Sequence, residues 1–329
     1  MEKLIDIIIP AYKAHKTLFK TLASIAAQTM SENLTVVVVN DCCPEGSYQD
    51  IIDHFKSELD ITEIILKKNV GPGAARQVGI DSSLNPFIMF CDADDVFASP
   101  TAVEILYMNI RSNNANVIGS SFIEQTAPGV YVPHNDDMVW VFDKIYRRDF
   151  LVRYDISFTE SRANEDTCFN RKVIIAQQTL GKPIISINFV SYVWTNKNQQ
   201  SITRANSGQY TYDQNIVGFI DGMIECIDWM ERQHIHENII KEQIYGCTVF
   251  LYLVSCHMLQ VAKQEFVDQA FNAMRKFLQI VSEKYTLDWY SADFLGEYES
   301  HLEDLKVNNR FSYIMIMEMN FWQWLKFLV

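Results

Sequence analysis

An alternation of strand-like and helix-like patterns over residues 4–122 is the feature that most restricts the fold of this chain. Short apolar or β-branched runs alternate with stretches whose apolar residues recur at helical spacing. Strands are expected at residues 4–9, 35–39, 61–66, 87–91 and 116–122, and helices at 18–26, 51–55, 74–81 and 101–112. Such an order forms a mainly parallel sheet with right-handed crossovers and helices on both faces. The sequence therefore predicts an α/β fold.

The pattern changes twice after residue 122. Short strands, Gly/Pro punctuation and polar loops occupy about 123–204, and apolar residues return to helical spacing from about 211 to 329. A boundary near Ser207-Gly208 would divide an α/β domain, residues 1–207, from a helical region, residues 208–329. The helical region carries no readable chemical motif, so packing, oligomerisation or substrate recognition is expected of it.

Charge and cysteine content narrow the class of protein. The net charge of -13, from 28 Lys plus Arg and 41 Asp plus Glu, disfavours broad nucleic-acid binding, which depends on neutralising phosphates. The 7 cysteines are odd in number and irregularly spaced, as reduced intracellular thiols are. The N-terminus runs straight into a strand without a secretion signal, and the most apolar stretch, 245–262, reads as a buried helix. A cytoplasmic protein without a membrane span is expected.

Two carboxylates follow the expected strand at residues 87–91. Asp92 and Asp94 lie at its carboxyl end, and in an open α/β sheet ligands bind at this edge. Paired carboxylates are hard oxygen ligands suited to Mg²⁺ or Mn²⁺ and, through the metal, to a diphosphate. Asp-rich loops also form plain turns and helix caps, so the motif needs support from other segments.

Three further segments bring suitable residues to the same edge. Asp41, after the second strand, can accept hydrogen bonds from a nucleotide base, and Pro10 and Tyr12 can form a flat pocket against the base ring. Gly73 permits close backbone approach before a helix. Arg76 suits a phosphate or a charge-assisted pair with a carboxylate. A structural role stays open for each: strand-end packing for Tyr12, a turn for the glycine loop and a salt bridge for Arg76.

In this order and spacing, the segments resemble the family-2 glycosyltransferases over roughly residues 4–204. The shared motifs are a strand then Pro-x-Tyr, a strand then a paired aspartate, an Asn-x-Gly…Ala-Arg stretch, and Asp-x-Asp. The resemblance implies a GT-A-type domain that binds a nucleotide sugar, a UDP-sugar being favoured, with Mn²⁺ or Mg²⁺. It implies Asp94 as the first choice of metal ligand, with Asp92 serving the ribose or the metal's water. The remaining donor-binding residues would be Pro10, Tyr12, Asp41, Gly73 and Arg76.

A later motif resembles the family's Glu-Asp pair at a helix start. Inverting transfer needs a base for the acceptor hydroxyl, and the resemblance implies Asp166 in this role with Glu165 supporting it. By themselves these carboxylates could be helix caps, worth under ~1 kcal/mol. Residues 141–148 resemble the stretch that precedes this motif, and we expect them to line the acceptor side.

The chain also departs from the family pattern. Asn40-Asp41-Cys42-Cys43 follows the second strand where Asp-Asp-Gly-Ser is usual, and Trp194-Thr195 stands where Tyr-Arg is usual. A phosphate-binding arginine is therefore absent from position 195, which leaves Lys197 or Arg204 as substitutes.

The combined interpretation is a metal-dependent inverting glycosyltransferase, a hexosyl- or pentosyltransferase, that uses a nucleotide sugar and favours a saccharide acceptor. The helical region would recognise the acceptor, pack or oligomerise. Two alternatives stay open. One is transfer to a modified base in viral DNA, and the other is a nucleotide-sugar-binding protein without catalysis.

Overall fold

The computed structural model describes residues 2–159, 164–195, 214–261, 264–291, 294–296, 298–300 and 321–328. The chain divides into two compact units, Met1–Asn198 and Gln199–Val329, called here the sheet unit and the helical unit. Each unit is defined by the contacts that its residues make with one another. The functional boundary expected near residue 207 stays a prediction.

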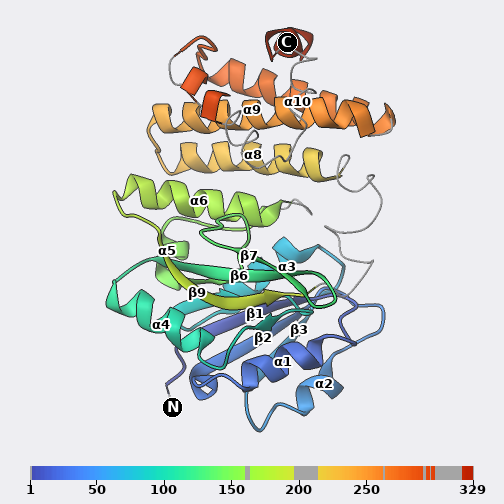
Figure 1. Ribbon diagram of the computed structural model, residues 1–329, viewed down its shortest axis with the longest axis vertical. Helices are drawn as coiled ribbons and strands as arrows, with labels where there is room; N and C mark the ends of the chain where they lie inside the picture. Colours follow the sequence, from blue (N-terminus) through green and yellow to red (C-terminus); the bar gives the residue numbers. More distant parts are fainter. Residues whose placement is uncertain are drawn as a thin grey trace. The chain divides into compact units, whose positions relative to one another are not determined.

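One curled, mixed sheet forms the centre of the sheet unit (Figure 1). Its strands lie in the order β3-β2-β1-β4-β8-β6-β9-β5, with β7 paired to β6. Their bounds are β1 (Ile5–Ala11), β2 (Leu34–Asn40), β3 (Asp60–Ile65), β4 (Phe87–Phe90), β5 (Val96–Phe97), β6 (Val117–Ala127), β7 (Val130–His134), β8 (Lys144–Arg147) and β9 (Ile185–Trp194).

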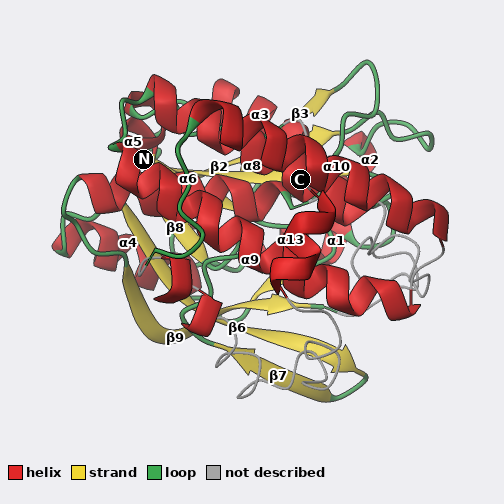
Figure 2. Ribbon diagram, turned by 90° about the horizontal axis from the view of Figure 1, so that it is seen from above, coloured by secondary structure: helices red, strands yellow, loops and turns green. Residues whose placement is uncertain are grey.

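Four of the five strands that the alternation predicted, β3, β2, β1 and β4, pair in parallel. The fifth, predicted at residues 116–122, lies in β6. Beyond β4 the sheet becomes mixed. β8 is antiparallel to both β4 and β6, and β5 is antiparallel to β9, while β6 and β9 are parallel. β7 lies at the outer edge beside β6 (Figure 2), because a tight turn with Gly129 at φ +77° joins the two strands as a hairpin.

Helices cover both faces of the parallel part, as expected. The helices of the sheet unit are α1 (Leu18–Ala26), the 3-10 helix η1 (Ser31–Asn33), α2 (Gln49–Asp53), α3 (Pro72–Ser82), α4 (Ala102–Ser112), α5 (Arg148–Arg153) and α6 (Glu165–Thr179). Ile7 and Ile9 of β1 belong to the core beneath α1 and α4. Ile8 points to the other face, where Gly79 of α3 lies against it. Alternate residues face opposite sides of a strand, so burial of both sides explains the unbroken apolar run of β1.

The described part of the helical unit contains long or amphipathic helices. They are α8 (Gln214–Arg232), α9 (Glu237–Val261), α10 (Gln264–Lys284) and α13 (Phe321–Leu328). Trp324 of α13 is buried and contacts Tyr252 of α9, so the aromatic last helix packs in a core. Within the described part of the chain, no helix is both long and apolar enough to cross a membrane.

Candidate active site

The residues expected to bind donor and metal lie at the carboxyl ends of β1, β2 and β4. β1 and β2 end side by side, and the N–H of Asp41 donates to the carbonyl of Ala11. β4 ends beside Ile8, whose carbonyl accepts the N–H of Cys91. Pro10 is the second-to-last residue of β1, and Tyr12 follows the strand with 46% of its surface exposed. The sheet therefore brings together segments that are far apart in the sequence, at the edge where the sequence placed them.

Asp41 is buried and holds the loop that precedes α3. Its carboxylate accepts hydrogen bonds from the N–H groups of Val70 (2.7 Å) and Gly71 (2.9 Å) and from the Asn69 amide (2.8 Å). The next residue, Cys42, has φ +54°, a left-handed conformation that suits the glycine usual at this point in the family. Besides any contact with a base, Asp41 thus anchors the glycine loop, a role that the sequence alone did not reveal.

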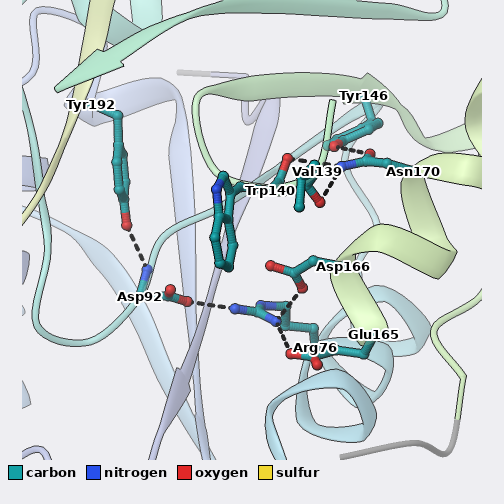
Figure 3. A network of polar contacts seen from close by, with 9 residues as sticks. All are labelled: Arg76, Asp92, Val139, Trp140, Tyr146, Glu165, Asp166, Asn170 and Tyr192. Carbon is teal, nitrogen blue, oxygen red and sulfur yellow. Dashed lines mark hydrogen bonds and ion pairs between the residues drawn. The ribbon is translucent and has the colours of Figure 1, made fainter. Parts of the chain in front are cut away.

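Arg76 of α3 is the centre of a buried ion network (Figure 3). Its Nη2 donates to Asp92 Oδ1 at 2.7 Å, and its Nη1 donates to Glu165 Oε1 at 3.1 Å and Asp166 Oδ1 at 2.7 Å. Of the two roles considered for Arg76, pairing with a carboxylate is the one observed. One guanidinium faces three carboxylates, so the network has an excess of negative charge.

The start of α6 approaches α3 closely at Gly73. A Cβ added to Gly73 would lie 2.7 Å from the Cγ of Glu165. Only glycine leaves room for this approach, which carries Glu165 and Asp166 to Arg76. Both carboxylates also occupy the first turn of α6, where the helix dipole favours negative charge. Gly73 was predicted to contact the donor; the structure places it against Glu165.

Burial raises the pKa of both carboxyl groups at the start of α6, Glu165 and Asp166. Asp166 is removed from water, and this burial, with repulsion from Glu165 and Asp92, raises its pKa to about 8 against the opposing effects of Arg76 and a backbone hydrogen bond from Val141. Burial also raises the pKa of Glu165. A carboxyl group that holds its proton up to neutral pH is suited to proton transfer near that pH.

A second polar network, which no sequence motif indicates, lies behind Asp92 and Asp94. The Tyr192 hydroxyl accepts the N–H of Asp92 (3.0 Å) and donates to the buried Asp95 carboxylate (2.9 Å). Thr195 donates its N–H to Asp95 (2.7 Å) and its hydroxyl to the carbonyl of Asp94. Thr195 therefore fixes the loop that carries Asp94 and Asp95, at the position where the family has an arginine. Lys197 and Arg204 lie outside the described residues.

The strand end fits a divalent cation that shares its ligands with a substrate. The described residues contain no cluster of three or more His, Cys, Asp or Glu side chains able to hold a metal. Mg²⁺ in phosphate-handling sites is commonly held by one or two carboxylates, with phosphates and waters completing the shell. Asp92 and Asp94 can supply such a pair. The side chain of Asp92 is 29% exposed, and the pair lies beside the excess negative charge of the Arg76 network.

Comparisons with known proteins agree with this geometry. Residues 6–165 match the sequence model of glycosyl transferase family 2. Poly(ribitol-phosphate) β-N-acetylglucosaminyltransferase TarS of Staphylococcus aureus is 28% identical over 186 residues, which are 52% of this chain and 32% of TarS. EpsJ of Bacillus subtilis, an uncharacterized glycosyltransferase, is 27% identical over 194 residues, 52% of this chain and 56% of EpsJ. The matches thus span about a third to a half of these relatives.

Solved structures share the fold over nearly the whole chain. Residues 1–349 of S. aureus TarS, solved in complex with UDP-GlcNAc, superpose with a TM-score of 0.68 at 19% identity, covering 94% of this chain and 93% of that one. The mannosyltransferase PcManGT of Pyrobaculum calidifontis, in complex with GDP-Man and Mn²⁺, has a TM-score of 0.52 at 12% identity, with coverages of 95% and 88%. By its sequence match, the segment of residues 6–165 is that of a family 2 glycosyltransferase, and the fold of the chain is of the GT-A type.

Proposed function

We propose that this protein is a metal-dependent, inverting glycosyltransferase that moves a sugar from a UDP-sugar to a hydroxyl group of a saccharide. The network around Arg76 carries the proposal. It joins Asp92, at the edge expected to bind donor and metal, to Asp166, the expected base, through one guanidinium. Donor-side and acceptor-side groups are thereby held at a fixed separation, as a single-displacement reaction requires.

Asp166 is the base of the proposed reaction. The acceptor oxygen attacks the anomeric carbon, the bond from that carbon to the diphosphate oxygen breaks, and the nucleoside diphosphate leaves with the bonding electrons. The hydroxyl proton passes to the Asp166 carboxylate. Its raised pKa makes it a stronger proton acceptor than an exposed aspartate, once it is ionised. Glu165 supports the arrangement by sharing Nη1 of Arg76.

The donor base would lie at the ends of β1 and β2. Tyr12 is half exposed there, beside Pro10, and can cover a flat ring, while Asp41 fixes the neighbouring loop and offers a carboxylate to the base edge. A UDP-sugar is proposed as donor because TarS, which shares the fold, was solved with UDP-GlcNAc. The sugar itself is proposed as N-acetylglucosamine on the same ground.

Asp94, with Asp92, would hold Mn²⁺ or Mg²⁺, which when bound neutralises the charge that develops on the leaving diphosphate. The charges of the surrounding side chains also favour a cation at this site. Arg76 is paired with Asp92, Glu165 and Asp166, and Asp94 and Asp95 follow Asp92 in the chain. A diphosphate would otherwise meet a negative field. A reducing, cytoplasmic setting is proposed from the odd number and irregular spacing of the 7 cysteines.

Release of UDP from UDP-GlcNAc tests the function directly. We expect Mn²⁺-dependent release that saccharide acceptors accelerate and that EDTA abolishes, with binding of UDP raising the melting temperature. If hydroxymethylated DNA accelerates the release of UDP and saccharides do not, the acceptor is a modified base in DNA and not a saccharide. Binding of UDP without any turnover, across nucleotide sugars and acceptors, would leave a binding protein and refute the enzyme.

A further inference from the structure

Two side chains of α6 hold the short segment Val139–Val141, which precedes β8. The Nδ2 of Asn170 donates to the carbonyls of Trp140 (2.8 Å) and Val139 (3.3 Å). The backbone of Val141 hydrogen-bonds to the carboxylate of Asp166. Residues 166 and 170 are one helical turn apart on the same face. The segment is therefore fixed at two points, one of them the proposed base itself.

Asn170 makes this attachment rigid. The side chain is fully buried, with 0% of its surface exposed. Its Oδ1 accepts a hydrogen bond from the Tyr146 hydroxyl at 2.8 Å, while its amide serves the two carbonyls. Both ends of the amide are thus satisfied, and loss of either would leave a buried polar group unpaired. A rigid polar attachment of this kind is more than the packing of a surface loop requires.

The segment presents the indole of Trp140 at the proposed active site. The ring stacks on Phe142, with centroids 5.8 Å apart and planes 9° apart, and it contacts Trp194 at 4.9 Å. It is nevertheless only partly buried. Figure 3 shows it directed toward the Arg76–Asp92 pair, on the side where Asp166 lies. An aromatic surface next to carboxylates suits a pyranose, whose C–H face is apolar and whose hydroxyl groups need acceptors.

We propose that Trp140 is a binding platform for the pyranose ring of the acceptor, and that Asn170 is the positioning residue that sets this platform relative to Asp166. The inference rests on the proposed function, because it takes Asp166 as the base. It adds the chemical class of the acceptor, a ring sugar rather than an open-chain polyol, and it gives a role to two residues for which the motifs assign none.

The platform is tested with p-nitrophenyl β-glycopyranosides as acceptors and UDP-GlcNAc with Mn²⁺ as donor. We expect Trp140→Leu, which keeps apolar volume against Phe142, to raise the acceptor KM about tenfold or more. Trp140→Phe should retain most of the acceptor affinity. The dissociation constant for UDP, measured by calorimetry, should stay the same in both variants. Trp289→Leu is the matched control, because Trp289 is also a partly buried indole but belongs to the helical unit.

The positioning role of Asn170 is tested by combining its substitution with that of Trp140. Asn170→Leu should raise the acceptor KM, and combining it with Trp140→Leu should add little, because the first change acts through the second residue. Tyr146→Phe should show a smaller effect in the same direction. Additive effects of the two leucine variants, or a change confined to the melting temperature, would make Asn170 purely structural and overturn this part.

The outcomes separate the inference from the proposed function. If the wild type hydrolyses the donor and transfers sugar to these acceptors while Trp140→Leu does so with an unchanged KM, the platform is refuted and the function stands. Turnover of the donor with no use of any pyranoside by the wild type also refutes the platform, since the acceptor class is then wrong. A wild type that neither binds UDP nor consumes the donor refutes the function itself, and the inference with it.

Discussion

At the scale of single residues, the site depends on one arginine shared by three carboxylates. Arg76 cannot neutralise Asp92, Glu165 and Asp166 together, so at least one carboxyl group is driven toward its protonated form. Burial makes Asp166 such a group. The same arrangement that destabilises the ionised form of Asp166 would make it an effective proton acceptor in the proposed reaction.

Replacing Asp166 by asparagine separates catalysis from binding. Asp166→Asn keeps the shape and a hydrogen-bond acceptor toward Arg76 but removes the proton acceptor. We expect turnover to fall by about 10²–10⁴, the usual effect of a positioned base, while the UDP dissociation constant changes little. Steady-state kinetics and calorimetry on one preparation measure both. Near-normal turnover with a lowered melting temperature would reduce Asp166 to a helix-capping residue.

The same residue predicts a pH dependence of stability. The pKa of Asp166 is raised from 3.8 to about 8, so the folded state binds this proton more tightly than the unfolded state. The contribution of Asp166 to stability is therefore fully present below about pH 4 and is lost as pH rises toward 8. Asp166→Asn does not titrate, so its melting temperature relative to the wild type should increase between pH 5 and pH 8. Calorimetric scans at both values decide this, and a constant difference would contradict the raised pKa.

At the scale of elements, the contact between α3 and α6 brings the halves of the site together. This contact depends on Gly73, whose position leaves no space for a side chain beside Glu165. The sequence placed Gly73 in the site, but not against α6, because nothing in local spacing shows which helix will approach a given turn. The structure thus adds a second role for Gly73, leaving room for Glu165, while its contact with the donor stays a prediction.

Gly73→Ala should separate the two helices. The added methyl group must displace Glu165 or shift the helix start, and overpacking of this kind costs about 1–3 kcal/mol. Turnover should fall more than stability does, because the displaced helix carries Asp166. Gly296→Ala is the control, since a Cβ at Gly296 meets no atom within 4 Å. Urea unfolding and turnover are measured for both variants. Equal behaviour of the two would show that α3 and α6 accommodate a side chain at this contact.

Sequence periodicity was sufficient for the parallel half of the sheet and for β6, and insufficient for the remaining strands. The runs that became β1, β2 and β4 are buried on both faces, so their apolar character is continuous and visible. β5 is two residues long, and β8 four, too short for any periodic signal. The Tyr192–Asp95 and Tyr146–Asn170 contacts join residues 97 and 24 positions apart. Motif spacing does not report such pairs, which is why Asp95, Tyr192 and Asn170 were missed.

At the scale of the whole molecule, electrostatics favour a cation-dependent donor site. The chain carries a net charge of -13, and the proposed site itself contains more carboxylates than cations. A UDP-sugar brings further negative charge to this surface. Binding of donor and divalent cation should therefore be coupled, each raising the affinity for the other by the same factor.

Asp94→Asn tests this coupling. With Mn²⁺ present, the variant should bind UDP about tenfold or more weakly than the wild type, since it loses a charged metal ligand while the fold survives. With EDTA, the ligand carboxylate has no cation to bind, and it only repels the diphosphate. The variant should then bind UDP as well as the wild type or slightly better. Calorimetric titration of UDP in the two buffers gives a four-member cycle, in which the metal effect and the Asp94 effect should be strongly non-additive. Asp81→Asn is the control, because Asp81 is an exposed carboxylate on α3 that contacts Gln77. An equal loss of affinity in Mn²⁺ and in EDTA would remove Asp94 from the metal site and leave its carboxylate acting on the nucleotide directly.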